Sequence, residues 1–346
     1  MKKIIISIIF VLVLLTINPY TIKHYIRPYL LPNDKASIEE LKLEYRPDMY
    51  IGGFSGGIII YDGKNLIKYS ENKKIEFEAT IRSDNFSVGT SYEFIYILDK
   101  VKRKVYQIDN LGEIKGQIDT DKLISGIDVF SDGSFILRYA TDIKTDGLLV
   151  YNKSCEFLKD ITYPKTTINI ISNDVISNGF MVSGLLRDED SLNNSIFYYN
   201  QKLEAVMACD VLDSIFIDMG FIKDKIIMLD INNIVVMNRD FKELYKVSSE
   251  ANYYKMYIND MSMWTLDSKN KIQELDYTGA IIKEQNYKED IIYLGKYKNK
   301  MLLATKNAIM LEDKEIEMPK DIVDVVPLEN KIVLVFRDSI RFLKVE

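Results

Sequence analysis

The chain has 346 residues, of which 28% are charged and 47% hydrophobic, a composition typical of folded globular proteins and not of disordered ones. Residues 48–346 carry 38 Lys and Arg against 47 Asp and Glu, a net charge of −9. This region repels phosphate backbones, so we expect no nucleic-acid partner. The one histidine, His24, lies outside it, which excludes a Ser-His-Asp triad or a histidine-ligated metal there. We therefore expect no catalytic residues, no metal and no cofactor.

Residues 1–22 predict a membrane anchor. Two lysines, Lys2 and Lys3, precede a run at 4–17 in which twelve of fourteen residues are strongly apolar. As a helix, this run is about 21 Å long, and it reaches about 28 Å if continued to Ile22, close to the ~30 Å hydrocarbon layer. The residues expected in the bilayer include Ile4, Phe10, Leu14 and Ile17.

A cleaved signal peptide and a buried core helix are the alternatives to this anchor. A signal peptide ends in small residues before its cleavage site, but Asn18-Pro19-Tyr20 follows the apolar run here. A core helix would need a hydrophobic partner near it, and the strand-rich region begins about thirty residues later. An uncleaved anchor at the N-terminus predicts a single-pass protein of the cell membrane, with the rest of the chain on the extracytoplasmic side.

Residues 23–47 read as a linker between anchor and domain. Ser37 and Glu40 have the spacing of a helix capping box, which predicts a short helix from Ser37 to Glu44. The following domain is expected to span residues 48–346.

That domain consists of repeated hairpins. Short β-rich runs end in Asp or Asn, the residues that favour tight turns, and these ends recur at steps of 37 to 48 residues. The runs are Gly57–Asp62, Val105–Asp109, Leu148–Asn152, Ser195–Asn200, Ile234–Asn238, Lys271–Asp276 and Ala308–Asp313, with an eighth copy at Ser339–Leu343.

A repeat of about 40 residues with four short strands predicts an all-β propeller of antiparallel blades. A β-helix would have shorter coils, and an immunoglobulin-like array would have longer domains. Eight blades fit the hairpin count and seven are the alternative, because the first repeat lacks a clear inner strand and the last lacks an outer one. The glycines at 52, 53, 56 and 57 are interpreted as two strand-end turns.

Two cysteines and several tyrosines have structural interpretations. Cys155 and Cys209 occupy similar positions in successive repeats, so we expect unpaired thiols on the outer strands of neighbouring blades. The tyrosines of the repeated strands, Tyr61, Tyr106, Tyr151, Tyr198 and Tyr199, could form a carbohydrate platform, but packing is the ordinary role of Tyr in strands.

The chain lacks the signatures of familiar propellers, namely the Gly-His and Trp-Asp pairs of WD40 repeats, the recurring tryptophan of quinoproteins and the sialidase Asp box. The region from Met49 onward nevertheless resembles a family of uncharacterised, single-pass, membrane-anchored propellers of anaerobic Gram-positive bacteria. The resemblance lies in the Lys-Lys anchor, Gly57–Asp62, Phe94–Asp109 and Asn169–Tyr199. It implies a fold and a topology, and no activity.

Two loops are the candidate binding site. Most loops inside the hairpins have two to six residues, but those at 141–147 and 187–194 are longer and acidic. Equivalent loops of successive blades emerge on one face, so we expect them side by side, where binding residues concentrate. The candidate residues are Asp142, Asp146, Arg187, Asp188, Glu189 and Asp190.

Three uses of these loops remain open, beside solvated loops with no ligand. The first is contact with an envelope protein, which would make the chain a non-catalytic extracytoplasmic scaffold or sensor. The second is a glycan, bound or cleaved by paired carboxylates. The third is Ca²⁺, although neither loop has the spacing of a known calcium loop.

Overall fold

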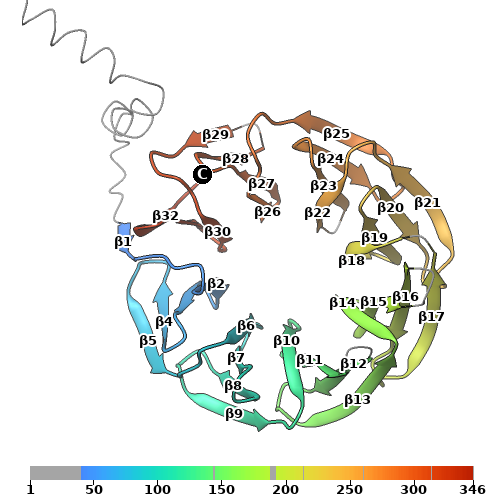
Figure 1. Cartoon of the computed structure of the whole chain (residues 1–346). Helices are drawn as coiled ribbons and strands as arrows, with labels where there is room; N and C mark the ends of the chain where they lie inside the picture. Colours follow the sequence, from blue (N-terminus) through green and yellow to red (C-terminus); the bar gives the residue numbers. More distant parts are fainter. Residues whose placement is uncertain are drawn as a thin grey trace, which may run out of the picture. The chain divides into compact units, whose positions relative to one another are not determined.

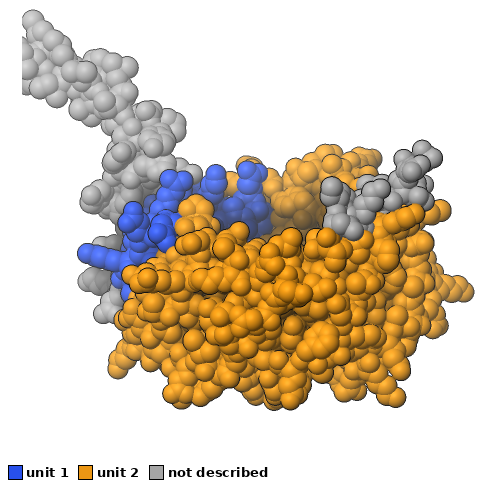
Figure 2. Space-filling model, turned by 60° about the horizontal axis from the view of Figure 1, so that its bottom comes forward, with its two compact units in different colours: residues 1–46, 290–346 blue, residues 47–289 orange. Residues whose placement is uncertain are grey.

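The computed structural model describes residues 40–142, 145–187, 192–212, 214–259, 261–312 and 314–345. The predicted anchor, with Ile4, Phe10, Leu14 and Ile17, lies outside these ranges. Within them, no helix has the length and hydrophobicity of a membrane span. The chain divides into two compact units, residues 47–289 (unit 2) and residues 1–46 with 290–346 (unit 1), coloured separately in Figure 2.

The strands of the described residues form eight four-stranded antiparallel sheets, the blades of a β-propeller, which confirms the fold and the preferred blade number (Figure 1). Blades 1 to 3 are β2 (Tyr50–Phe54), β3 (Gly57–Tyr61), β4 (Asn65–Ser70), β5 (Ile75–Thr80); β6 (Phe86–Thr90), β7 (Ile95–Asp99), β8 (Lys104–Ile108), β9 (Ile114–Asp119); and β10 (Leu123–Val129), β11 (Phe135–Asp142), β12 (Thr145–Tyr151), β13 (Phe157–Pro164). Blades 4 to 6 are β14 (Thr166–Asp174), β15 (Gly179–Arg187), β16 (Leu192–Tyr199), β17 (Ala205–Val211); β18 (Phe216–Ile222), β19 (Lys225–Asp230), β20 (Asn233–Met237), β21 (Glu243–Ser248); and β22 (Tyr253–Ile258), β23 (Ser262–Asp267), β24 (Lys271–Asp276), β25 (Ile281–Asn286). Blade 7 is β26 (Tyr293–Tyr297), β27 (Lys300–Ala304), β28 (Ala308–Leu311), β29 (Lys314–Glu317), and blade 8 is β30 (Asp324–Pro327), β31 (Ile332–Val335), β32 (Ser339–Leu343) with β1 (Glu40–Lys42).

The outer strand of the last blade comes from the N-terminal segment. Residues 40–42 pair antiparallel with β32, Glu40 opposite Arg341 and Lys42 opposite Ser339. The helix predicted from Ser37 to Glu44 is therefore wrong over its described part, and the propeller begins at β1 and not at residue 48. An edge strand of a sheet presents unpaired N–H and C=O groups, and β1 satisfies those of β32.

Hydrophobic cores fill the spaces between consecutive blades. In unit 2, one cluster lies between each neighbouring pair of blades, and in unit 1 another joins blades 7 and 8. The second strand β7 shows how: Ile95 and Ile97 face blade 1, while Tyr96 and Leu98 face blade 3. Side chains of a strand alternate between its two faces. A strand whose residues are all apolar must therefore be covered by a neighbouring blade on each face.

A common turn links the third and fourth strands of the blades in unit 2. In blade 4, the Asn200 carbonyl Oδ1 accepts the backbone N–H groups of Lys202 and Glu204 at 2.9 and 3.0 Å, and the Leu203 N–H donates to Asn200 O at 2.8 Å. The fourth turn residue has a positive φ of 57 to 87° in blades 1 to 6, at Lys73, Gly112, Cys155, Leu203, Phe241 and Gly279. The Asp and Asn residues predicted to end strands in blades 2 to 6 do so through this hydrogen bonding.

The first repeated run differs from the later ones in its place within the blade. Gly57–Asp62 belongs to the second strand of its blade, whereas Val105–Asp109 and the later runs form third strands. Asp62 caps the turn after the second strand, with Oδ1 accepting the N–H groups of Lys64 and Asn65 at 2.8 and 2.6 Å, so both kinds of turn look alike in sequence. The inner strand of this blade, which the sequence pattern did not predict, is β2. It includes Gly52, where the Tyr50 ring occupies the space of a Cβ.

The cysteines and tyrosines have structural roles. Cys155 and Cys209 are free thiols, as predicted, although only Cys209 lies on an outer strand, since Cys155 precedes β13. Burial raises the pKa of both thiols. The tyrosines at 61, 151 and 199 are buried, and those at 106 and 198 are half-buried and pack against the cores, which supports the packing interpretation.

Substitution of Gly112 by Ala tests the shared turn. Because Gly112 has φ +83° and an added Cβ would lie 2.6 Å from the Phe77 ring, we expect the free energy of unfolding to fall by about 1–2 kcal/mol. Lys73→Gly, at the matched position of blade 1, should leave it unchanged or raise it by up to about 1 kcal/mol. Urea unfolding measures both, and equal effects at the two positions would contradict the turn geometry.

Candidate functional site

Blades 3 and 4 have the longest strands, with seven to nine residues each against four to six in most other blades. Their second and third strands remain paired up to Asp142 opposite Thr145 and Arg187 opposite Leu192. The loops predicted at 141–147 and 187–194 are therefore mostly extended hairpin, and only residues 143–144 and 188–191 lie outside the described ranges.

The structure describes three of the six predicted site residues, and they lie in two blades. Asp142 ends β11 and Arg187 ends β15, in adjacent blades as expected. Asp146 lies on β12, where its carboxylate accepts the backbone N–H of Ile168 at 2.8 Å and so holds blade 3 to the inner strand of blade 4. Asp188, Glu189 and Asp190 lie outside the described residues, so a binding role for them stays a prediction.

A crevice of about 450 Å³ lies at the opposite end of the same two blades. Its walls are apolar side chains that come from the hairpins and turns of both blades. They include Phe130, Val150, Tyr151, Leu158, Val175, Phe180 and Leu203. Its volume is in the range of ordinary ligand pockets, which occupy about 300–1,000 Å³. Sequence reasoning did not find this crevice, because its walls come from five separate segments.

Four amide side chains also line the crevice, those of Asn152, Asn173, Asn178 and Gln201. The Asn152 Oδ1 caps the turn before β13, whereas the other three make no side-chain hydrogen bond among the described residues. The crevice thus has apolar walls and free donors and acceptors at one end of blades 3 and 4.

An apolar hairpin tip stands at the rim. Val175 and Ile176, in the connection from β14 to β15, are each 68% exposed, and Leu158 is 49% exposed beside the same crevice. The only sequence signal of this tip is an aliphatic pair inside a polar turn, Asp174-Val-Ile-Ser-Asn-Gly179.

A buried carboxylate holds the tip in place. Asp174 is fully buried, accepts the Tyr198 hydroxyl at 2.8 Å, and forms an ion pair with Arg239 from the turn of blade 5. The Arg239 guanidinium also lies 4.7 Å from the Phe221 ring centroid and donates to Lys223 O at 2.9 Å. Burial raises the pKa of Asp174, but Arg239 and Tyr198 outweigh it, so the pKa lies below its ordinary value.

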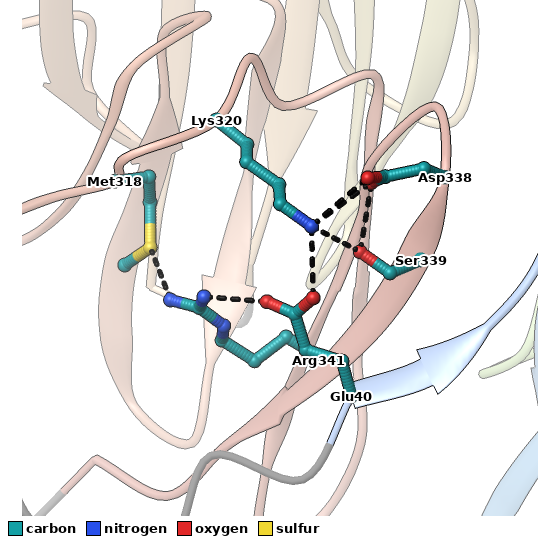
Figure 3. A network of polar contacts seen from close by, with 6 residues as sticks. All are labelled: Glu40, Met318, Lys320, Asp338, Ser339 and Arg341. Atoms are coloured by element: carbon teal, nitrogen blue, oxygen red, sulfur yellow. Dashed lines mark hydrogen bonds and ion pairs between the residues drawn. The ribbon is translucent and has the colours of Figure 1, made fainter. Parts of the chain in front are cut away.

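A second polar site, in unit 1, secures the N-terminal strand (Figure 3). Glu40 accepts Lys320 Nζ at 2.9 Å and Arg341 Nη2 at 2.6 Å, and Lys320 also binds Asp338 at 3.1 Å. Burial opposes ionisation of Glu40, but these cations outweigh it and lower its pKa. A groove of about 570 Å³ adjoins the network, with Lys42 and Arg337 in its lining. Because Lys320 and Arg341 already share a carboxylate, we assign this network to anchoring β1.

Comparison with known proteins identifies the fold of the chain and no family. No family model matches the sequence, and no curated protein matches it. Solved structures are similar: Sqt1 of Saccharomyces cerevisiae (TM-score 0.66, 11% identity, 89% of this chain and 99% of that one) and BamB of Moraxella catarrhalis (0.60, 9%, 88% and 100%). The computationally designed protein Ika8 is similar too (0.58, 10%, 89% and 98%). The chain has the β-propeller fold. Its resemblance to the membrane-anchored family stays a prediction.

Substitution of Arg239 by Met tests the support of the hairpin tip. It leaves the buried Asp174 carboxylate without its cation, and we expect the free energy of unfolding at pH 7 to fall by about 3–5 kcal/mol. The pKa of Asp174 is lower in the folded protein than in the unfolded chain, so its carboxylate stabilises the fold at pH values above the ordinary pKa of about 4. This stabilisation is lost as the pH falls through the pKa of the folded protein. The difference between wild type and variant should therefore shrink below about pH 4, and a pH-independent difference would contradict the pairing.

Substitution of Glu40 by Gln tests the anchoring of β1. With the carboxylate charge removed, the cations of Lys320 and Arg341 lose their shared partner, and we expect faster hydrogen exchange at the amides of β1 and β32. Mass spectrometry of peptides from residues 40–46 and 337–343 measures this. Glu44→Gln, at an exposed residue of the same segment, is the control and should change nothing. Equal exchange in both variants would show that the network does not hold the strand.

Proposed function

We propose that this chain is a non-catalytic, membrane-tethered propeller that binds another protein of the cell envelope on the extracytoplasmic side. The apolar run at 4–17 behind Lys2 and Lys3 supports the tether and the export of the propeller. The absence of histidine from residues 48–346 supports a binding role over the commonest catalytic chemistries.

The observation that supports protein binding most directly is the apolar hairpin tip. Val175 and Ile176 are 68% exposed, although the buried Asp174 beside them is fixed by Tyr198 and Arg239. Scattered exposed apolar residues are common, but Val175 lines an open crevice together with Leu158, and Ile176 follows it in the chain. Aliphatic side chains held rigidly beside a pocket can be buried by a partner with little loss of conformational entropy.

The test is crosslinking in intact cells with a membrane-impermeant amine reagent, followed by mass spectrometry. Lys202, in the turn that lines the crevice, supplies an exposed amine. Wild type should yield one reproducible envelope protein, and Val175→Ser/Ile176→Ser should reduce its capture by about tenfold or more, because the partner loses two apolar contacts. Leu111→Ser, at a residue 68% exposed in the turn of blade 2, is the matched control and should not change the capture.

Two results would contradict the proposal. If no protein is captured from wild type, the scaffold function fails. If capture survives in Val175→Ser/Ile176→Ser and is lost in Asp188→Ala/Glu189→Ala/Asp190→Ala, the partner binds at the acidic residues predicted from sequence and not at the hairpin tip.

A further inference from the structure

The crevice between blades 3 and 4 combines apolar walls with amide side chains at its opening. Its apolar walls belong in part to the core between the two blades, since Val150 and Phe180 pack there. Three of its four amides, those of Asn173, Asn178 and Gln201, line the opening and make no side-chain hydrogen bond among the described residues. Unpartnered amides beside apolar walls are suited to a ligand with matching groups.

A carboxamide side chain offers a carbonyl acceptor and an NH₂ donor. A peptide backbone carries the complementary pair at every residue, a C=O acceptor and an N–H donor. Three amides around one opening could therefore bind an extended backbone at successive residues, while the alternate side chains of that peptide enter the crevice.

The walls favour a peptide over a sugar. Sugars bind proteins through the open faces of aromatic rings, but the ring of Phe180 stacks on Tyr199 with centroids 4.9 Å apart, and Phe130 leans against Phe180 at 6.1 Å. The Tyr151 ring stacks on Phe135 with centroids 5.1 Å apart. The other apolar walls are aliphatic, with Leu158, Val175 and Leu203 among them. Aliphatic walls bury apolar side chains and offer a hydroxylated ring no partners.

The charge of the lining residues favours a ligand without acidic groups. The one side chain among the lining residues that is charged at neutral pH is Asp132, whose Oδ1 accepts the backbone N–H of Ser134 at 2.9 Å and its hydroxyl at 2.7 Å. Strong recognition of an acidic or phosphorylated ligand needs Arg or Lys in the pocket, and the lining contains neither.

We propose that this crevice binds an extended peptide segment of the partner protein, with an aliphatic or aromatic side chain in the apolar pocket and the backbone hydrogen-bonded to Asn173, Asn178 and Gln201. The inference rests on the protein-binding function proposed above and names the chemistry of its partner. Val175 and Ile176 at the rim extend the apolar contact beyond the crevice.

The test selects peptides from a phage-displayed library of random linear dodecapeptides on the full-length protein in lipid nanodiscs. Enriched peptides should share an apolar anchor residue. Fluorescence anisotropy then gives the Kd of a synthetic winner, and Asn173→Leu/Gln201→Leu should raise it by about tenfold or more, because two hydrogen bonds are lost. Methylation of the peptide's backbone nitrogens beside the anchor should weaken binding to wild type and leave binding to the variant unchanged.

Controls separate a lost contact from a damaged fold. Asn110→Leu, at the equivalent turn position in blade 2 and outside the crevice, should leave the Kd unchanged. Gln201 is exposed, so Gln201→Ala should keep the wild-type urea midpoint while it weakens binding.

Three outcomes would overturn the inference: no enrichment over empty nanodiscs, an unchanged Kd in Asn173→Leu/Gln201→Leu, or displacement of the peptide by chitohexaose at equal concentration, which would assign the crevice to glycans. If these occur while crosslinking in cells still captures a partner through Val175 and Ile176, the scaffold function stands and only the peptide crevice is rejected. Failure of both experiments would reject the function itself.

Discussion

The second strand of each blade in unit 2 has little surface left for solvent. In β7, Ile95 and Ile97 face one neighbouring blade and Tyr96 and Leu98 face the other, all fully buried. Burial of each such side chain contributes about 1.5–3 kcal/mol, and an isolated blade would expose both of its faces. Blades of this sequence are therefore stable only when stacked, and the stacking is the constraint from which the rest of the structure follows.

Stacking of the blades constrains the central part of each strand, whereas the lengths of the strands and the turns at their ends can differ between blades. In blades 3 and 4, the strands grow longer, Asp146 bonds across to Ile168, and a crevice opens at the other end. The buried pair of Asp174 and Arg239 joins blade 4 to blade 5 and fixes the exposed tip at Val175 and Ile176. A scaffold made rigid by its blade interfaces thus presents an apolar surface that the fold itself does not require, which is the physical basis of the proposed binding function.

The repeat could be predicted from sequence because its signals are local: apolar strands and Asp or Asn caps at nearly constant spacing. The errors arose where contacts are distant. Glu40 has the spacing of a capping box, yet it pairs with Arg341, 301 residues later in the chain, so β1 became the missing outer strand. Residues 141–147 look like a loop because a hairpin that extends past its neighbours can be polar on both faces. The crevice could not be predicted from sequence because its walls come from several separate segments. The acidic residues at 188–190 were predicted as a site because they are adjacent in sequence.

Site-specific photo-crosslinking tests the central claim most directly, namely that a protein partner covers the apolar tip of blade 4. The photoreactive residue p-benzoylphenylalanine would replace Ile176 in the full-length protein in its native membrane, and in a parallel strain Val101, which is 65% exposed after the second strand of blade 2, at the other end of the blades. The account predicts a crosslinked protein adduct from position 176 and none from position 101. An adduct from position 101 alone, or from neither position, would contradict it.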